Sequence, residues 1–223
     1  MAFVHLTSYM SRPAPENTSY IVHLTSYIRK MRVAIILGSI RRGRQSHKIG
    51  YYLAQKIKEK QIDVTMIDLA EHPLPMMEEE NGNLHDPAGD ISIIGAQLKD
   101  ADAMILVSPE YHGSFTGVLK NALDFYWAEF KKKPIGVVTT GSGRMGGINA
   151  STQMQHIVLS LGAYPVPVKL LIPEIQHAFN DQFEPLREDI VRNSERFLNE
   201  FVWFANAIVK AKEEHPEKAS SKS

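Results

Sequence analysis

The chain has 223 residues, 43% of them hydrophobic, so it can bury the core of one large domain or two small ones. Lys and Arg together number 25 and so do Asp and Glu, and this zero net charge argues against nucleic acid or an anionic membrane as a bulk partner. The absence of cysteine excludes disulfides and cysteine metal sites, and no apolar run approaches the roughly 18 residues that span a bilayer, so we expect a cytoplasmic protein without a membrane span.

The first 30 residues differ from the rest of the chain. The pentapeptide HLTSY occurs there twice, at 5–9 and 23–27, which is too short and too isolated for a repeat architecture. The segment also lacks the charged start and the continuous apolar stretch of a secretory signal. We therefore expect residues 1–30 to be a peripheral or disordered extension, residues 31–210 to form one domain and residues 211–223 to be a flexible tail.

A strand, a polar loop and a helix are predicted in succession in the stretch MRVAIILGSIRRGRQSHKIG at 31–50. The β-branched apolar run at 33–37 is typical of a central strand covered on both faces, and one helical face then carries Ile49, Leu53 and Ile57. This order places free backbone N–H groups and the positive end of a helix dipole at the loop, where they stabilise an anion. Side chains that can add donors, charge or a helix cap lie at Ser39, Arg41, Arg42, Arg44 and Ser46.

The residues after this strand exclude two well-known phosphate loops. There is neither a G-x-G-x-x-G motif nor a loop that closes with G-K-[ST], so the chain has no dinucleotide fingerprint and no NTPase P-loop at this point. The loop therefore suits a terminal monophosphate. From this stretch alone, an ordinary strand-to-helix turn with a capping serine and solvated arginines remains open.

Strand and helix patterns alternate through the rest of the predicted domain. Further apolar strands are predicted at 64–69, 103–108, 135–140 and 166–172. Helices are predicted at 91–99, 116–130, 148–161 and 191–208. Five such units predict a parallel sheet with helices on both faces, and Pro165 and Pro167 favour an edge position for the last strand.

Right-handed crossovers bring the loops after the first, third and fourth strands to the same carboxyl edge of the sheet. These loops have the sequences GSIRRGRQS, SPEYHGSFTG and TGSGRMGG, which begin at Gly38, Ser108 and Thr140. Their glycines permit close backbone approach to a flat ligand, and Pro109 stiffens the middle loop. The convergence of the three loops predicts a single binding site at this edge.

The combination of LGSIRRGRQS, SPEYHGSFTGVLKNALD and TTGSGRMGG resembles the NAD(P)H-dependent FMN reductases, which include quinone, azo-dye and chromate reductases. The likeness covers residues 31–171 in the expected order, and the middle motif is its most specific part. The resemblance implies a flavodoxin-like fold: a doubly wound, five-stranded parallel α/β sheet of order 2-1-3-4-5 in three α/β/α layers.

The same resemblance implies FMN as the cofactor and assigns residues to it. The first loop would hold the FMN phosphate through Ser39, Arg41 and Ser46. The second would lie along the isoalloxazine and the ribityl chain through Pro109, Glu110, Tyr111, His112 and Gly113. The third would border the pyrimidine end of the ring through Thr140, Gly141, Ser142, Gly143 and Arg144. Backbone N–H groups at 111–113 and 141–143 would stabilise negative charge on the reduced flavin.

Two positions depart from the family pattern, which usually has Asn where this chain has His112 and Pro where it has Thr116. The first departure changes the polar group near the flavin, and the second is expected to loosen the start of the following helix. His112 can contact the flavin or make an ordinary loop hydrogen bond, and Glu110 is interpreted as a local cap or partner rather than as a general base. No essential catalytic side chain and no metal site is predicted.

The resemblance implies an enzyme that passes a hydride from NADPH or NADH through bound FMN to a small-molecule electron acceptor. A flavodoxin-like electron carrier without its own NAD(P)H oxidation remains an alternative, as does a non-flavin enzyme for a phosphorylated metabolite. The 116–130 segment has more apolar residues than one buried helix face requires, and together with the family's tendency to assemble this indicates a homodimer or homotetramer. These residues are Leu119, Leu123, Phe125, Tyr126 and Trp127.

Overall fold

The computed structural model describes residues 30–78 and 89–215. The expectations for the N-terminal extension and for residues 216–223 of the tail lie outside this part of the chain, as do residues 79–88. Within the described residues, no helix is both long enough and apolar enough to cross a membrane.

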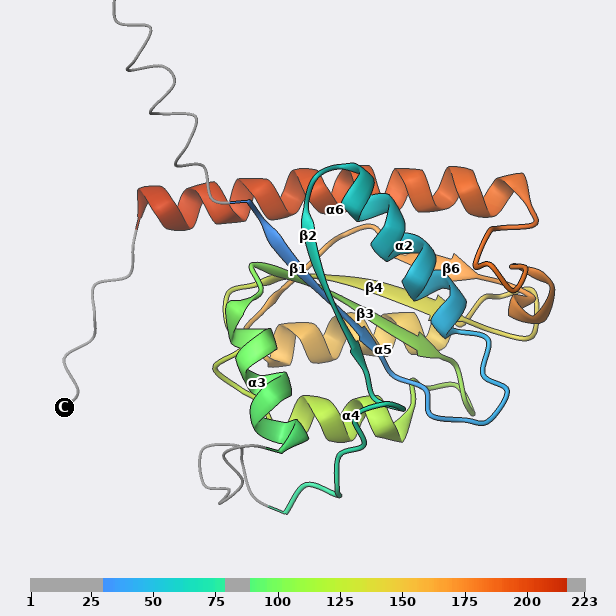
Figure 1. Ribbon diagram of the computed structural model, residues 1–223, viewed down its shortest axis with the longest axis horizontal. Coiled ribbons are helices and arrows are strands. Elements are labelled where there is room, and N and C mark those ends of the chain that lie inside the picture. Colours follow the sequence, from blue (N-terminus) through green and yellow to red (C-terminus); the bar gives the residue numbers. More distant parts are fainter. Residues whose placement is uncertain (1–29, 79–88, 216–223) are drawn as a thin grey trace, which may run out of the picture. The chain divides into compact units, whose positions relative to one another are not determined.

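A parallel sheet forms the centre of the fold (Figure 1). Its strands are β1 (Arg32–Leu37), β2 (Asp63–Asp68), β3 (Ala103–Pro109), β4 (Pro134–Thr140), β5 (Tyr164–Pro165) and β6 (Leu170–Ile172). The strand order is β2-β1-β3-β4-β5, with β6 also paired to β4, and every pair is parallel. Every residue of β3 and β4 is buried, as expected for central strands covered on both faces. The predicted strand order is confirmed, with a sixth strand added.

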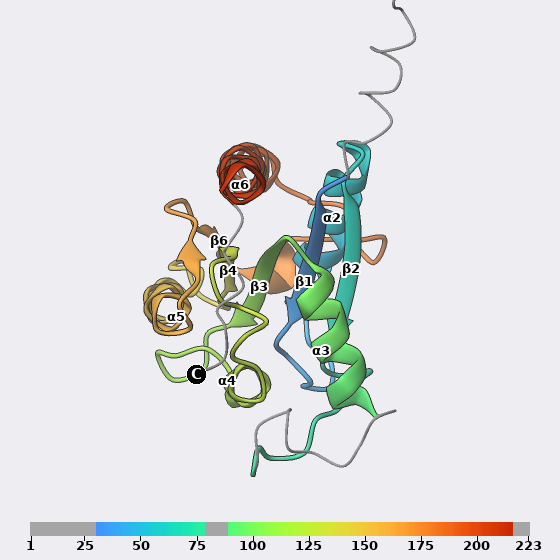
Figure 2. The ribbon, with the colours of Figure 1, turned by 90° about the vertical axis from the view of Figure 1, so that its left-hand side faces the viewer.

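Helices cover both faces of the sheet (Figure 2). One face is covered by α2 (His47–Glu59) and α6 (Glu188–Glu214). The other face is covered by α3 (Asp90–Asp100), α4 (Gly117–Asp124) and α5 (Ile148–Ser160). The last helix continues four residues past the predicted end of the domain at Lys210.

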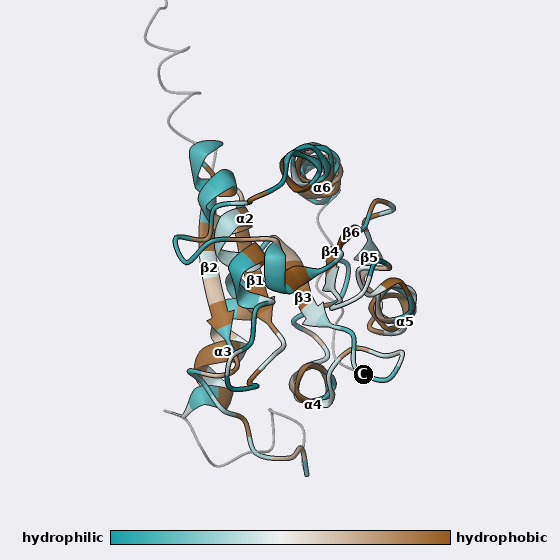
Figure 3. Cartoon of the chain, turned by 90° about the vertical axis from the view of Figure 1, so that its right-hand side faces the viewer, coloured by the Kyte–Doolittle hydropathy of each residue, from teal (hydrophilic) through white to brown (hydrophobic). Residues whose placement is uncertain are grey.

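Two hydrophobic cores result, because successive side chains of a strand point to opposite faces. Ile35 of β1 packs into the core beneath α2 and α6 together with Phe197, whereas its neighbour Ile36 packs with Ile94 and Leu123 beneath α3 and α4. Hydrophilic residues predominate on the outer helices α2 and α6 (Figure 3). The three-layer architecture therefore follows from the alternation of strands and amphipathic helices.

The predicted fifth strand at 166–172 is wrong as a continuous element. Only its last three residues form a strand, β6, whereas β5 precedes the predicted range and residues 166–169 between the two are not strand. Pro165 and Pro167 lie where the chain stops forming a regular strand, and neither can donate a backbone hydrogen bond to the sheet. Val166 still donates to the carbonyl of Ile135 at 2.9 Å, so the chain stays beside β4. Its edge position agrees with the prediction.

The helix predicted at 116–130 is about half as long in the structure, where α4 ends at Asp124. Phe125, Tyr126 and Phe130 follow in turns and are all buried. One helical face cannot bury adjacent residues such as Phe125 and Tyr126, so the chain leaves the helix and both rings enter the core. The Tyr126 hydroxyl donates to the carbonyl of Ile91 at 2.8 Å. Of the aromatic residues expected at an interface here, Trp127 alone is exposed, at 65%.

The start of α4 is held more firmly than predicted. Thr116 is the N-cap, and its hydroxyl accepts a hydrogen bond from the backbone N–H of Leu119 at 3.2 Å. The same hydroxyl donates to the carbonyl of Gly38 in the loop after β1. The expected loosening is therefore wrong, because Thr116 caps the helix and ties it to the first predicted ligand loop.

Candidate functional site

The three predicted loops meet at the carboxyl edge of the sheet, where β1, β3 and β4 end (Figure 1). They enclose a pocket of about 320 Å³. The predicted residues that line it are Ser39, Arg41, Ser46, Pro109, Glu110, Tyr111, Thr140, Gly141 and Ser142. His112, Gly113 and Gly143 do not line it. Arg44, which the sequence offers as a source of charge at this loop, also lines the pocket, and sequence reasoning missed Gly43, Gln45, Ile175 and Gln176 as lining residues.

Two hydroxyl groups of this pocket are buried without a hydrogen-bond partner. They are Ser39 Oγ in the loop after β1 and Thr140 Oγ1 at the end of β4, on residues that are 3% and 0% exposed. A buried polar atom without a partner costs about 1–3 kcal/mol, so such atoms call for a compensating ligand. A polar, oxygen-rich ligand in the pocket would satisfy both.

Arg44 shapes the first loop instead of projecting into solvent. Both terminal nitrogens of its guanidinium contact the buried carboxylate of Asp68 at the end of β2, and Nη1 also donates to the carbonyl of Ser39 at 2.7 Å. The hydrogen bond to Asp68 raises the pKa of Arg44. Arg41 and Arg42 are exposed. Two arginines line the pocket, Arg41 and Arg44. Among the described residues, Arg41 forms no ion pair with a carboxylate, so its charge is available to a ligand.

The N-terminus of α2 faces this loop. Ser46 is the N-cap residue, but its side chain makes no capping hydrogen bond, so its predicted role as a side-chain cap is wrong. His47 packs against Tyr51 and Phe183, with ring centroids 6.1 Å and 5.8 Å away. Burial, followed by the charge of Arg44, lowers the pKa of His47, so the imidazole is neutral at pH 7. The imidazole therefore adds no positive charge to the helix dipole at this end of α2.

The middle loop is a tight hairpin. Tyr111 and Ser114 exchange backbone hydrogen bonds of 2.8 and 3.1 Å, and the two central residues, His112 and Gly113, have φ of 51° and 78°. Positive φ at both positions is typical of a type I′ turn, which favours Asn-Gly. This explains why Asn suits the position of His112. The exposed imidazole lies at the tip of the turn and not in the pocket.

Glu110 fixes the middle loop to α5. Its carboxylate accepts hydrogen bonds from the backbone N–H of Ala150 at 2.9 Å and from the side chain of Asn149 at 3.3 Å. These contacts satisfy donors in the first turn of α5. The interpretation of Glu110 as a local cap rather than a general base agrees with this geometry.

The third loop is packed against the segment after β6. Gly141 accepts from the N–H of Ile175 at 3.1 Å, and Gly143 accepts from the N–H of Glu174 at 3.2 Å. Gly147, with φ of 86°, lies so close to β4 that a Cβ there would be 2.9 Å from Cβ of Thr139. These contacts bring Ile175 and Gln176 to the pocket. Their residue types carry no signal of binding, although they follow the last strand at the same sheet edge.

Within residues 30–78 and 89–215, no group of three or more His, Asp or Glu side chains is arranged to hold a metal ion. The pocket offers hydroxyls, exposed N–H groups, one free guanidinium and a helix N-terminus. These groups suit an anionic, oxygen-rich ligand.

Comparisons with known proteins agree with this geometry. Residues 31–177 match the family model of the NADPH-dependent FMN reductases. The chain is 35% identical over 146 residues to an FMN-dependent NADPH-azoreductase of Staphylococcus saprophyticus, covering 63% of this chain and 76% of the relative. It is 31% identical over 191 residues to the protein of the same name in Staphylococcus aureus, covering 79% of this chain and 96% of the relative.

Solved structures show the same fold. The flavoenzyme NAD(P)H:(acceptor) oxidoreductase FerB of Paracoccus denitrificans superimposes with a TM-score of 0.68 at 21% identity, covering 79% of this chain and 98% of that one. An archaeal flavodoxin superimposes with a TM-score of 0.53 at 13% identity, covering 80% of this chain and 99% of that one. The fold is thus flavodoxin-like, and the extent of the family match shows that this chain belongs to the NADPH-dependent FMN reductases.

Proposed function

We propose that the pocket binds FMN with its phosphate on the loop after β1 and its isoalloxazine between the loops after β3 and β4. The observation that carries this proposal is the pair of buried, partnerless hydroxyls on Ser39 and Thr140 in one pocket. Phosphate and pyrimidine oxygens are acceptors that such hydroxyls can satisfy. The glycines of the third loop let it pack tightly against β4 and the segment after β6, which holds the loop at the rim of the pocket.

The phosphate would be held by the dipole and N–H groups of α2, by Ser39 and Ser46, and by the free charge of Arg41. Arg44 contributes indirectly, since its bonds to Asp68 and to the carbonyl of Ser39 hold the loop in shape. Preorganised donors of this kind bind an anion without first reorganising.

Fewer backbone donors are available near the ring than the sequence predicts. The N–H of Tyr111 is bonded to Ser114 and that of Gly141 to the carbonyl of Ile172, at 2.8 and 3.1 Å. Among the loop hydrogen bonds of the described residues, none uses the N–H of Ser142 or Gly143. Because Ser142 lines the pocket and Gly143 does not, we assign the stabilisation of negative charge at the ring to the N–H of Ser142.

The chemistry that FMN supplies when bound is two-electron transfer from NADPH to an acceptor. The chain's own residues position the reactants and provide no side-chain acid or base, because Glu110 is engaged by α5. We propose an azo compound or a quinone as the acceptor. The names of the staphylococcal relatives support an azo compound.

The experiment is an anaerobic titration of the FMN-loaded protein with NADPH, followed by addition of an azo dye or a quinone. The expected result is loss of the visible absorbance of oxidised flavin on adding NADPH and its return on adding the acceptor. Bleaching by NADPH without reoxidation by either acceptor would contradict the proposed acceptor class. A protein that binds no FMN would overturn the proposal as a whole.

A further inference from the structure

A short segment after β6, residues 174–176, holds the third loop by its backbone. Residues 141–143 of the loop have three consecutive carbonyls, and each accepts a hydrogen bond from this segment. In the order of the carbonyls, the donors are the N–H of Ile175 at 3.1 Å, Nε2 of Gln176 at 3.3 Å and the N–H of Glu174 at 3.2 Å. Three successive peptide units of the loop are therefore fixed by one short segment.

These bonds also decide where the N–H groups of the loop point. A trans peptide unit is planar, and its C=O and N–H lie on opposite sides. Gly141 and Ser142 share one such unit, so the bond from Ile175 to the Gly141 carbonyl turns the N–H of Ser142 away from Ile175. Among the described residues, no loop hydrogen bond uses this N–H, and Ser142 lines the pocket. The segment 174–176 therefore sets the direction of the donor that we assign to the ring.

The segment depends on an unusual backbone conformation at Glu174. Its φ of 50° and ψ of 47° are left-handed, a region that residues with a Cβ rarely adopt. These two angles set the direction of the N–H of Ile175 relative to that of Glu174, and both groups donate to the loop. A residue other than glycine stays in this region only where its surroundings hold it there, and such residues cluster at functional sites.

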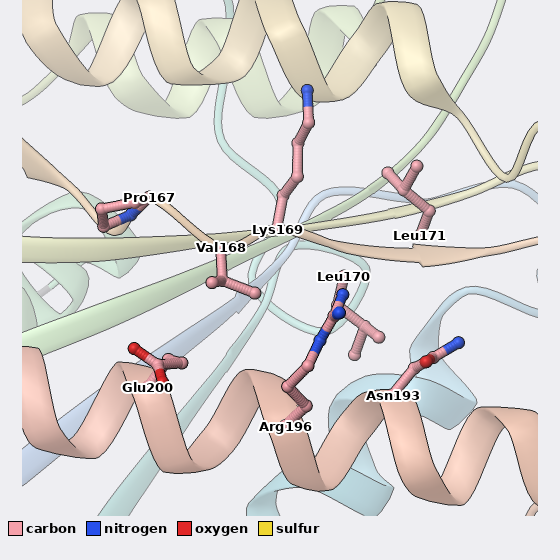
Figure 4. A pocket seen from close by; sticks show the side chains of 8 residues that line it. All are labelled: Pro167, Val168, Lys169, Leu170, Leu171, Asn193, Arg196 and Glu200. Atoms are coloured by element: carbon pink, nitrogen blue, oxygen red, sulfur yellow. The ribbon is translucent and has the colours of Figure 1, made fainter.

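Contacts on both sides hold Glu174 in place. Arg187, the N-cap residue of α6, lies 3.5 Å from the Glu174 carboxylate and donates to the carbonyl of Pro173 at 3.4 Å. The strand that leads into the segment is also fixed. Figure 4 shows Lys169, just before β6, pointing away from α6, and its Nζ donates to Thr152 of α5 at 3.1 Å. The segment is thus anchored at the end of β6 and at the start of α6.

We propose that Glu174 is a positioning residue for the reduction of FMN, an inference that rests on the proposed FMN site. Its left-handed backbone keeps the N–H of Ser142 free and fixed in direction. That donor stabilises the negative charge of the reduced flavin and so raises the reduction potential of bound FMN. The role belongs to the backbone of Glu174, because its carboxylate faces Arg187.

Two substitutions separate the backbone of Glu174 from its carboxylate. Glu174→Gly and Glu174→Val both remove the contact with Arg187, but glycine adopts a left-handed φ without strain and a β-branched residue does not. The measurement is the midpoint reduction potential of FMN bound to each variant. Glu174→Gly should keep the native potential. Glu174→Val should bind reduced FMN about tenfold more weakly relative to oxidised FMN, which lowers the potential of a two-electron couple by about 30 mV.

Equal potentials in the two variants would overturn the proposal. An equal shift in both would assign the effect to the carboxylate, and a native potential in both would show that the reduced flavin does not depend on the loop donor. If valine prevents folding, Glu174→Ala replaces it, because alanine also lacks the carboxylate and is less permissive than glycine. Its potential should then lie below that of Glu174→Gly, and equality would again overturn the proposal.

Hydrogen exchange in the FMN-free protein tests the segment separately from the cofactor. The amide of Ile175 is bonded to the loop, so its exchange should be slow in the native chain and in Glu174→Gly, and about tenfold faster or more in Glu174→Val. Retained protection in Glu174→Val would overturn the proposal, because the donor would then be aimed whatever conformation residue 174 prefers. A native protein that binds no FMN would overturn the proposed function, and the role in reduction with it, whatever the exchange result.

Discussion

The guanidinium of Arg44 and the carboxylate of Asp68 form a two-pronged ion pair that joins the loop after β1 to the end of β2. Asp68 is 2% exposed, and its Oδ1 also accepts from the backbone N–H of Ala70 at 3.0 Å. The pair therefore fixes the first ligand loop from a neighbouring strand. Removing one partner would leave the other buried without its counter-charge.

Asp68→Asn tests this role. The amide cannot balance Arg44, so the variant should unfold about 2 kcal/mol more easily in urea. It should also bind FMN about tenfold more weakly, since the donors of the loop are no longer preorganised. Arg42→Gln, which changes an exposed arginine of the same loop, should alter neither quantity. Native FMN affinity in Asp68→Asn would show that the ion pair serves stability alone.

Two adjacent threonines of β4 provide a second test, because replacing them should change the free energy of unfolding in opposite directions. Thr140 Oγ1 is buried without a partner, whereas Thr139 Oγ1 donates to the carbonyl of Gly146 at 3.1 Å. Thr140→Val should therefore stabilise the FMN-free protein by up to about 1 kcal/mol and weaken FMN binding roughly tenfold. Thr139→Val should destabilise the protein by about 1–2 kcal/mol, because it leaves a buried carbonyl unpaired. Thermal unfolding without FMN measures the change in stability of each variant, and unfolding with FMN adds the effect on binding. If FMN stabilised Thr140→Val and Thr139→Val equally, this would argue against a ligand at Thr140.

The hairpin at the tip of the middle loop predicts a stabilising substitution. His112 has φ of 51°, and Asn tolerates this conformation better than His in a type I′ turn. His112→Asn should raise the free energy of unfolding by a few tenths of a kcal/mol. Gly113→Ala, at φ of 78°, should lower it by about 1 kcal/mol or more. A loss of stability in His112→Asn would mean that the imidazole makes contacts beyond the turn.

The sequence predicts most of the sheet because strands such as β3 and β4 are continuous apolar runs between turn residues. The meeting of the three loops is predictable for the same reason, since the handedness of crossovers sends them to one edge. Motifs such as the one beginning at Gly38 also show which residues can donate hydrogen bonds or positive charge to a bound anion.

The missed features depend on tertiary contacts. The end of α4 is set by burial of the adjacent Phe125 and Tyr126, which outweighs helical periodicity. Arg44 looks like its exposed neighbours in sequence, and only the position of Asp68 on β2 gives it a structural role. The approach of Ile175 to the pocket likewise depends on hydrogen bonds across separate loops.

Lys133 gives a prediction about pH. Its Nζ donates to the carbonyls of Leu98 and Lys99 at 2.6 and 3.0 Å and so caps the end of α3. Burial lowers the pKa of Lys133 from 10.5 to about 8, and the charge of Lys212 acts in the same direction. At pH values between about 8 and 10.5, Lys133 is protonated in the unfolded chain and largely neutral in the folded chain. The unfolded chain then binds more protons, so the contribution of Lys133 to stability rises with pH across this range.

The measurement is the free energy of unfolding of the native protein minus that of Lys133→Met, from urea titrations at several pH values. Below about pH 8 the side chain is charged in both states, and the full cost of burying that charge is present. The difference should therefore become more favourable to the native chain as the pH rises from about 8 toward 10.5, while a neutral amine still donates to the α3 carbonyls. Lys131→Met is the control, because it removes the same kind of side chain from an exposed position two residues away. A flat profile for Lys133→Met would show that the ammonium group of Lys133 is as well solvated in the folded protein as in the unfolded chain.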